Sequence, residues 1–102
     1  MDPTKKNDLK HSISGKALRE RHRMLRVVGG LTRFKILSLL SAHGESLNVT
    51  QIAEILDAST STISHELIIL RKNNFVDSAT KGREVFYKTN GMMESLFPLL
   101  KP

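Results

Sequence analysis

The sequence contains no cysteine and no tryptophan, and only five of its 102 residues are aromatic. Without cysteine, the chain can form no disulfide, no thiolate zinc site and no cysteine nucleophile. Long apolar runs are also missing: the longest is Leu67–Leu70, far too short to cross a bilayer, and Met1–Lys10 lacks the apolar region of a signal peptide. We therefore expect a cytoplasmic protein with no membrane partner.

The composition is typical of a soluble globular domain. Hydrophobic residues make up 39% of the chain and charged residues 25%, which argues against a disordered protein. The length allows one domain with a small hydrophobic core. We expect a flexible basic arm over residues 1–11, where the sequence is polar, and a single domain over residues 12–102.

Positive charge is concentrated in the first third of the chain. The net charge is +6. Residues 1–30 hold eight basic and three acidic side chains, a net +5, whereas residues 31–102 hold eight basic and seven acidic side chains, a net +1. A basic excess favours a polyanionic partner, usually nucleic acid, although it also occurs on surfaces that only keep a protein soluble.

Two early segments carry apolar residues at helical spacing. The first predicts a helix over about Lys16–Val28, with Ser12 or Ser14 as its N-cap. The second predicts a helix over about Leu31–Ala42, which ends where Gly44 supplies a C-cap signal.

Two further helices follow in close succession. Asn48 and Gln51 have the spacing of a capping box, so a helix should begin after Asn48 and stop near Asp57. Ser59 can cap the next helix almost at once. Two helices joined by so few residues are typical of a helix-turn-helix.

The rest of the chain predicts a hairpin and a terminal helix. Phe75–Ala79 and Glu84–Lys88 are rich in β-favouring residues, and the basic segment Thr80–Arg83 joins them. The apolar segment Gly91–Leu100 follows, interrupted by Pro98. Four helices, a small β-hairpin and a last helix, in that order, make a mainly α fold of the winged helix-turn-helix class.

In a winged helix-turn-helix, the second helix of the helix-turn-helix pair enters the major groove of DNA and the wing lies beside the backbone. Here that helix is the one that starts after Ser59. The side chains of the helix that starts after Ser59 are unusually rich in hydroxyls at its exposed positions, and Lys81 and Arg83 lie at the hairpin tip. The candidate DNA-binding residues are therefore Ser59, Thr60, Ser61, Thr62, Ser64, His65, Lys81 and Arg83.

Residues 31–90 resemble the ArsR/SmtB family of bacterial and archaeal winged-helix repressors. The segments Leu31–Leu37, Ile52–Leu56, Ser59–Leu67 and Gly82–Tyr87 carry the likeness. The family pattern in the recognition helix is close to S-Q-S-T-V-S-R/Q-H-L, followed by a wing with G-R-x-x-Y-Y, and both have counterparts here in the same order.

The resemblance implies a homodimer that binds an inverted repeat in double-stranded DNA and represses transcription. The first and last helices would pack at the two-fold axis, and one recognition helix would enter each half-site. The candidate dimer-interface residues are Leu18, Leu25, Val28, Met92, Leu96 and Leu99.

The chain departs from the family where its relatives bind metals. Asn48 and Thr50 stand in the place of a Cys-x-Cys pair, and the last segment, 91–102, has no histidine and a single acid, Glu94. The four histidines do not have the spacing of a helical ligand pair; they are His11, His22, His43 and His65. We expect no metal, no cofactor and a regulator that does not respond to metals, with the inducer unknown.

The recognition helix also departs from the family, because His65 and Glu66 stand where relatives have Arg or Gln and then His. Glu66 would accept a hydrogen bond from cytosine, face solvent, or pair with a neighbouring arginine. The segment from Ser59 to Leu70 contains no Lys or Arg, so the target sequence should differ from that of relatives.

Two other functions remain open from the residues alone. A winged helix can serve as a protein–protein interaction module, which predicts an apolar recognition face, or as a non-specific DNA-binding protein, which predicts a basic one. An enzyme is not expected, since the sequence has no glycine-rich phosphate loop and no pair of carboxylates that stands out.

Overall fold

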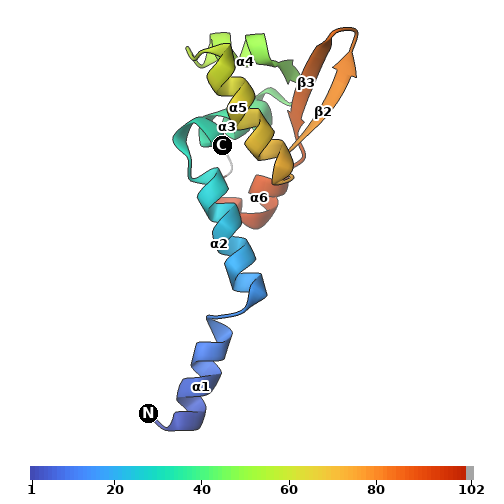
Figure 1. Cartoon of the computed structure of the whole chain (residues 1–102). Helices are drawn as coiled ribbons and strands as arrows, with labels where there is room; N and C mark the ends of the chain where they lie inside the picture. The colour runs from blue at the N-terminus through green and yellow to red at the C-terminus, as the bar shows by residue number, and fades with distance from the viewer. Residues whose placement is uncertain (101–102) are drawn as a thin grey trace.

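The computed structural model describes residues 1–100 as an elongated molecule (Figure 1). In chain order the elements are α1 (Pro3–Ser12), α2 (Lys16–Val28), α3 (Leu31–His43), β1 (Leu47–Asn48), α4 (Val49–Ile55), α5 (Thr60–Lys72), β2 (Val76–Lys81), β3 (Glu84–Thr89), α6 (Met92–Leu96) and the 3-10 turn η1 (Pro98–Leu100). The fold is that of a winged helix-turn-helix, as the sequence predicts.

The molecule is long because α1 and most of α2 project from the rest (Figure 1). Its extents are 62 × 23 × 21 Å, and the Cα radius of gyration is 17.3 Å. A compact chain of about 100 residues would have a radius of gyration near 13 Å. The excess comes from helices that have no neighbour within residues 1–100 over most of their length.

The sequence predicts a flexible arm over residues 1–11, but the structure contains a helix there, α1. The Asp2 side chain accepts a hydrogen bond from the Lys5 amide at 2.9 Å, and Pro3 occupies the first helical position. Both features favour a helix start. None of the residues of α1 is buried.

The helices α2 and α3 begin and end close to the predicted residues. The N-cap of α2 is Gly15, whereas Ser14, one of the two expected caps, donates its hydroxyl to the carbonyl of Lys10 at 2.8 Å. The C-cap of α3 is Gly44, with a φ of +76°, where glycine avoids the steric penalty of a side chain.

The helix-turn-helix is built from local signals that the sequence displays. Asn48 and Gln51 form the predicted capping box: the Asn48 side chain accepts from the Gln51 amide at 2.8 Å, and the Gln51 side chain accepts from the Asn48 amide at 2.9 Å. Ser59 caps α5 by accepting from the Thr62 amide at 3.1 Å. In the turn between α4 and α5, Asp57 has a φ of +52°, which Asp tolerates better than most residues.

The wing is a hairpin of two strands, and a third strand that the sequence does not predict pairs with one edge of it. Strands β2 and β3 pair antiparallel, with Lys81 opposite Glu84, so the loop between them has two residues instead of the expected four. Gly82 takes a φ of +64° in this turn. Strand β1 adds to the other edge of β3, which gives the sheet order β1-β3-β2.

The last segment is shorter than the predicted helix. Helix α6 ends at Leu96, and Pro98 begins a separate 3-10 turn, because proline cannot donate a backbone hydrogen bond. Gly91 is the N-cap, and Asn90 adds to the start of α6 by accepting from the Met92 amide at 3.0 Å.

One hydrophobic core holds α3, α4, α5 and the base of the wing together. Phe75, just before β2, is the largest fully buried side chain, and the core takes in the last residue of α2. The other core residues are Val28, Ile36, Leu37, Leu40, Leu47, Ile52, Ala53, Ile63, Leu67, Leu70, Val76 and Met93. The buried residues among residues 1–100 are all apolar, so this core depends on apolar packing.

The capping box of α4 can be tested by replacing its N-cap residue, Asn48. Asn48→Ala should lower the free energy of unfolding by about 1 kcal/mol, because an amide at the start of α4 loses its acceptor. The thermal midpoint, measured by circular dichroism at fixed protein concentration, should fall by about 4–8 °C. Asn48→Ser keeps a capping oxygen and should restore most of the loss; equal losses from both variants would contradict the capping role.

Candidate nucleic-acid interface

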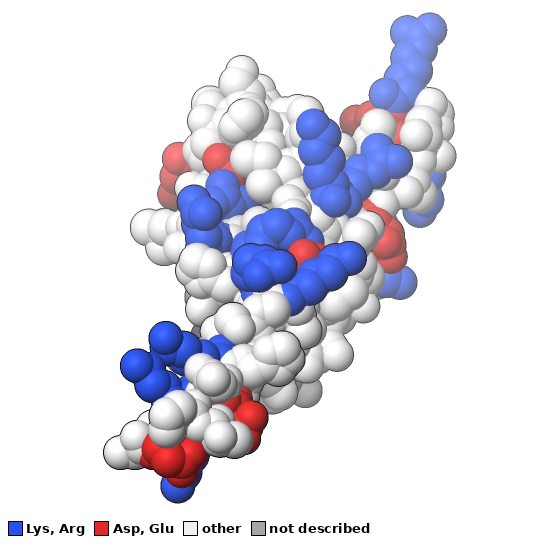
Figure 2. Space-filling model, turned by 60° about the horizontal axis from the view of Figure 1, so that its bottom comes forward, with Lys and Arg blue, Asp and Glu red and all other residues white. Residues whose placement is uncertain are grey.

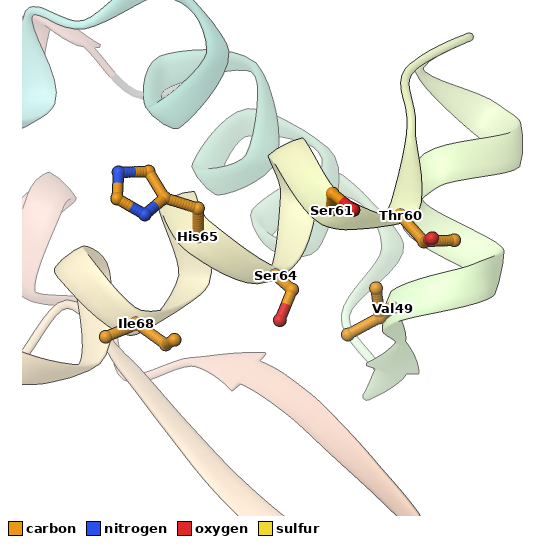
Figure 3. A pocket seen from close by; sticks show the side chains of 6 residues that line it. All are labelled: Val49, Thr60, Ser61, Ser64, His65 and Ile68. Atoms are coloured by element: carbon orange, nitrogen blue, oxygen red, sulfur yellow. The ribbon is translucent and has the colours of Figure 1, made fainter.

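The outer face of α5 presents four polar side chains to solvent. Thr60, Ser61, Ser64 and His65 lie on the first turns of the helix, and they line an open depression together with Val49 of α4 and Ile68 (Figure 3). Residues three and four apart on a helix lie on the same face, which is why this stretch of sequence gathers them. The structure therefore brings four of the predicted site residues together.

These four side chains are not used inside the domain. None of them has a hydrogen-bond partner among the side chains and backbone groups of residues 1–100. The opposite face of α5 carries Ile63, Leu67 and Leu70, which are fully buried. The helix is thus held by one face, and its other face keeps its donors and acceptors for an external partner.

Two of the predicted DNA-binding residues, Ser59 and Thr62, are hydrogen-bonded to each other at the start of α5. The Ser59 hydroxyl donates to the Thr62 hydroxyl at 2.8 Å, and Ser59 also caps the helix. Both residues are exposed at the start of α5 but lie outside the set that lines the depression. Their hydroxyls are engaged with each other, so their first role is to fix the helix start.

The wing borders the same face of α5. Ser64 and Val49 share a second depression with Val85 and Tyr87 of β3. Farther along α5, Ile68, Arg71 and Lys72 border a third depression, also with Tyr87. The base of the wing and the exposed face of α5 therefore form one continuous surface.

The two predicted wing residues lie near the hairpin tip. Arg83 is exposed in the turn itself. Lys81 lies on the hairpin face away from Ser64, with its Nζ 5.5 Å from the centroid of the Phe86 ring. It borders a depression with Phe86 and the loop at Gly44–Ser46. The wing therefore offers the basic side chains of Lys81 and Arg83 near its tip, whereas the acidic Glu84 borders the depression that Ser64 also lines.

The sequence analysis misses several residues of this surface, among them Val49, Ile68 and Tyr87. Ile68 is 49% exposed although it is apolar. Its position three residues after His65 and four after Ser64 was the available signal, because that spacing places all three on one face. Tyr87 belongs to the wing segment that carries the family likeness, but its place in the sequence does not show that it borders α5.

Glu66 is not part of the exposed face, because it pairs with Arg33 of α3. The Nη1 atom of Arg33 lies 2.7 Å from Oε2 of Glu66, and the two side chains are 22% and 17% exposed. The Nε of Arg33 donates to the Val27 carbonyl at 2.7 Å. Of the alternatives for Glu66, the structure favours pairing with a neighbouring arginine.

Basic side chains also gather on the face that α2 borders, as Figure 2 shows in blue. Arg23, Arg26 and Arg33 border one depression beside Val27. Arg23 donates to Asn73 at the end of α5 and pairs with Glu20. Its hydrogen bond holds the pKa of the Glu20 carboxyl below the ordinary value.

The predicted dimer residues separate into three groups. Leu18, Leu25 and Leu99 are exposed, with Leu25 at 48%. Met92 and Leu96 are half-buried against the core. The prediction for Val28 is wrong: this side chain is 1% exposed inside the core of its own chain, so it offers no surface to a partner.

Residues 1–100 contain neither a cluster of metal ligands nor a helix that could span a membrane. No three His, Asp or Glu side chains of the described chain lie close enough together to hold a metal ion. In the same residues, no helix has the length and apolar character needed to cross a membrane.

Comparison with known proteins supports the fold. Residues 31–78 match the bacterial regulatory protein, arsR family. Over 93 residues the chain is 32% identical to the transcriptional repressor PagR of Bacillus anthracis, covering 90% of this chain and 92% of PagR. The crystal structure of PagR superimposes with a TM-score of 0.69 at 31% identity, covering 83% of this chain and 97% of PagR.

Two more distant structures share the fold. HlyU of Vibrio cholerae gives a TM-score of 0.72 at 22% identity and covers 85% of this chain and 90% of HlyU. The homodimeric winged helix-turn-helix domain of Mb0332 from Mycobacterium bovis gives 0.68 at 24% identity, with 82% of this chain and 74% of that one covered. Together with the match to PagR over nearly its whole length, these findings show that the chain belongs to the ArsR family of transcriptional regulators, which have a winged helix-turn-helix DNA-binding fold.

Proposed function

We propose that this chain is a homodimeric repressor that binds an inverted repeat in double-stranded DNA with sequence specificity and without a metal signal. The single observation that carries the proposal is the exposed face of α5, whose polar side chains have no partner within the described residues. A repressor of this kind works in the cytoplasm, where it would block access of polymerase to a promoter.

The chemistry of this face fits the major groove. Hydroxyls such as those of Ser61 and Ser64 can donate to or accept from base edges, and the His65 imidazole can donate to guanine. The exposed Ile68 side chain can pack against the methyl group of thymine. Such a mixed surface distinguishes base pairs, whereas a non-specific binder would need mainly basic groups there.

Phosphate contacts would come from the edges of the surface. The free amides at the start of α5 favour an anion, and Arg71 and Lys72 lie at the other end of the same helix. Lys81 and Arg83 at the wing tip extend the reach along the DNA backbone. Arg33 is excluded from this role because it is already paired with Glu66.

The dimer proposal rests on α2 and the end of the chain. Leu18 and Leu25 are exposed one above the other on a helix that projects from the domain. Burying them against a second copy would recover apolar area that one chain leaves in water. The structure of the Mb0332 domain is described as homodimeric, which supports a dimer here.

The proposal that the signal is not a metal rests on the sequence. The positions that would carry Cys-x-Cys hold Asn48 and Thr50, and the chain contains no cysteine at all. Hydroxyl and amide side chains are poor ligands for soft metals. Release from DNA would then follow from another ligand, a protein partner or the protein concentration.

The first experiment is a binding titration by fluorescence anisotropy at several salt concentrations. It compares DNA from upstream of the protein's own gene with a scrambled duplex. A preference of about a thousandfold or more at physiological salt would establish a specific regulator. Equal and steeply salt-dependent binding to both the scrambled duplex and duplexes selected from random DNA would indicate a non-specific binder, and no binding at low salt would indicate a protein-interaction module.

Ser64→Ala tests the base-reading role of α5. We expect operator binding to weaken by about 1–3 kcal/mol, with little change for scrambled DNA, because a lost base contact removes discrimination. Ser41→Ala is the matched control, because Ser41 is a half-buried serine on α3 as Ser64 is on α5, and this variant should bind as the wild type does. Equal loss on both duplexes would exclude a base contact by Ser64.

Arg83→Ala tests the wing. Binding to every duplex should weaken, and the dependence of log affinity on log salt should become shallower by about one unit, because one fewer phosphate is neutralised. Arg83→Lys keeps the charge and should keep the slope. A slope that is the same in all three proteins would rule out a phosphate contact by this residue.

Leu25→Glu tests the dimer face. A charge buried at an apolar interface is costly, so light scattering should give the 11.5 kDa mass of one chain instead of twice that value. Ile55→Glu is the control, since Ile55 is as exposed as Leu25 but lies on α4. A Leu25→Glu protein that stays dimeric would show that the interface lies elsewhere.

A further inference from the structure

Two polar contacts join the projecting helix α2 to the recognition helix α5. In the first, Arg33 lies between the Val27 carbonyl and the Glu66 carboxylate. In the second, Arg23 donates to the side-chain oxygen of Asn73. We call these five residues the α2–α5 bridge. None of them belongs to the exposed face of α5 that lines the depression.

The Arg33 contact is specific in geometry. Its Nε and Nη1 atoms donate in two directions, each at 2.7 Å, one to the last turn of α2 and one to the middle of α5. A guanidinium is planar, and its donors are fixed relative to one another. The positions of Val27 and Glu66 are therefore fixed relative to each other through one rigid group.

Gly30 makes room for this guanidinium. A Cβ added at Gly30 would lie 2.6 Å from Cζ of Arg33, closer than real atoms approach. The φ of Gly30 is −67° and its ψ is 125°, a conformation open to any residue. A side chain at this position would thus displace Arg33 without straining the backbone.

The second contact of the α2–α5 bridge joins Arg23 of α2 to Asn73 at the end of α5. Asn73 caps the C-terminus of α5 and donates its side-chain amide to the Ile69 carbonyl at 2.8 Å. Its side-chain oxygen is left for Arg23, one turn before Val27 on α2. The two contacts together hold α2 at two successive turns.

The core holds only the last residues of α2. Val28 is buried, and Met24 and Val27 pack partly against the core, whereas residues 16–23 are all exposed. A 13-residue helix is about 20 Å long, so a tilt of about 10° at its anchored end moves the free end by about 3 Å. That displacement is close to the spacing of one base pair, about 3.4 Å.

We propose that the α2–α5 bridge sets the distance between the two half-sites that the dimer accepts. The inference rests on the proposed function, since it assumes that α2 forms the dimer and α5 enters the groove. The tilt of α2 relative to α5 then decides how far apart the two copies of α5 lie. Arg33 and Glu66 are positioning residues: they touch no base, and they select the operator by its spacing.

The test uses two variants that break the bridge by different routes. Gly30→Ala displaces the Arg33 guanidinium and leaves every charge in place, and Glu66→Ala removes its partner on α5. Glu54→Ala is the control for the second variant, because Glu54 is an exposed glutamate on α4 and the change in charge is the same. All proteins are full-length, with folding and dimer mass checked by circular dichroism and light scattering.

Binding is measured by anisotropy on duplexes whose two half-sites are separated by the natural spacer or by one or two base pairs more or fewer. A duplex with a single half-site reports binding that does not depend on spacing. In the wild type and in Glu54→Ala, one spacing should be preferred. In Gly30→Ala and Glu66→Ala, the preference should fall by about two- to thirty-fold or move to another spacing, with half-site binding retained.

A purely structural role would weaken binding to every duplex by the same factor, and that result would overturn the inference. An unchanged spacing optimum in both variants would overturn it as well, while leaving the proposed function standing. A wild type that prefers no spacing at all would refute the dimer on an inverted repeat, and the inference with it.

Discussion

The burial of one face of α5 is the constraint on which the rest of the structure depends. Ile63, Leu67 and Leu70 are fully buried against the core, and burying each such side chain stabilises the fold by about 1.5–3 kcal/mol. Because this face holds the helix, the polar face can remain without internal partners at no cost to folding. The wing and α4 then only need to border that face, and the pairing of β1 with β3 brings the wing to it.

Much of the fold could be predicted because its signals are local. The capping box needs only Asn48 and Gln51, three residues apart, and the start of α5 needs only Ser59. Spacing along one helix also gathered Ser61, Ser64 and His65 without any tertiary information. The same kind of signal was present for α1 in Asp2 and Pro3, but the polar composition of residues 1–11 outweighed it.

The features that could not be predicted join residues far apart in the sequence. Strand β1 has two residues and exists through its pairing with Phe86 and Tyr87. Arg33 and Glu66 are separated by 33 positions, and either could have been a surface charge. Val28 has the same apolar character as Leu25 but points into the core, a difference decided by where α3 turns back after the glycines.

Helix α1 has a thermodynamic consequence of its own. It has ten residues, none of them buried, and isolated helices shorter than about 12–15 residues are marginally stable in water. Its amide hydrogens should therefore exchange with solvent almost independently of global unfolding, whereas those of α5 exchange only when the core opens. Because the free energy of forming this helix is close to zero, a partner surface that buries the exposed side chains of Leu9 and Ile13 would be enough to stabilise it.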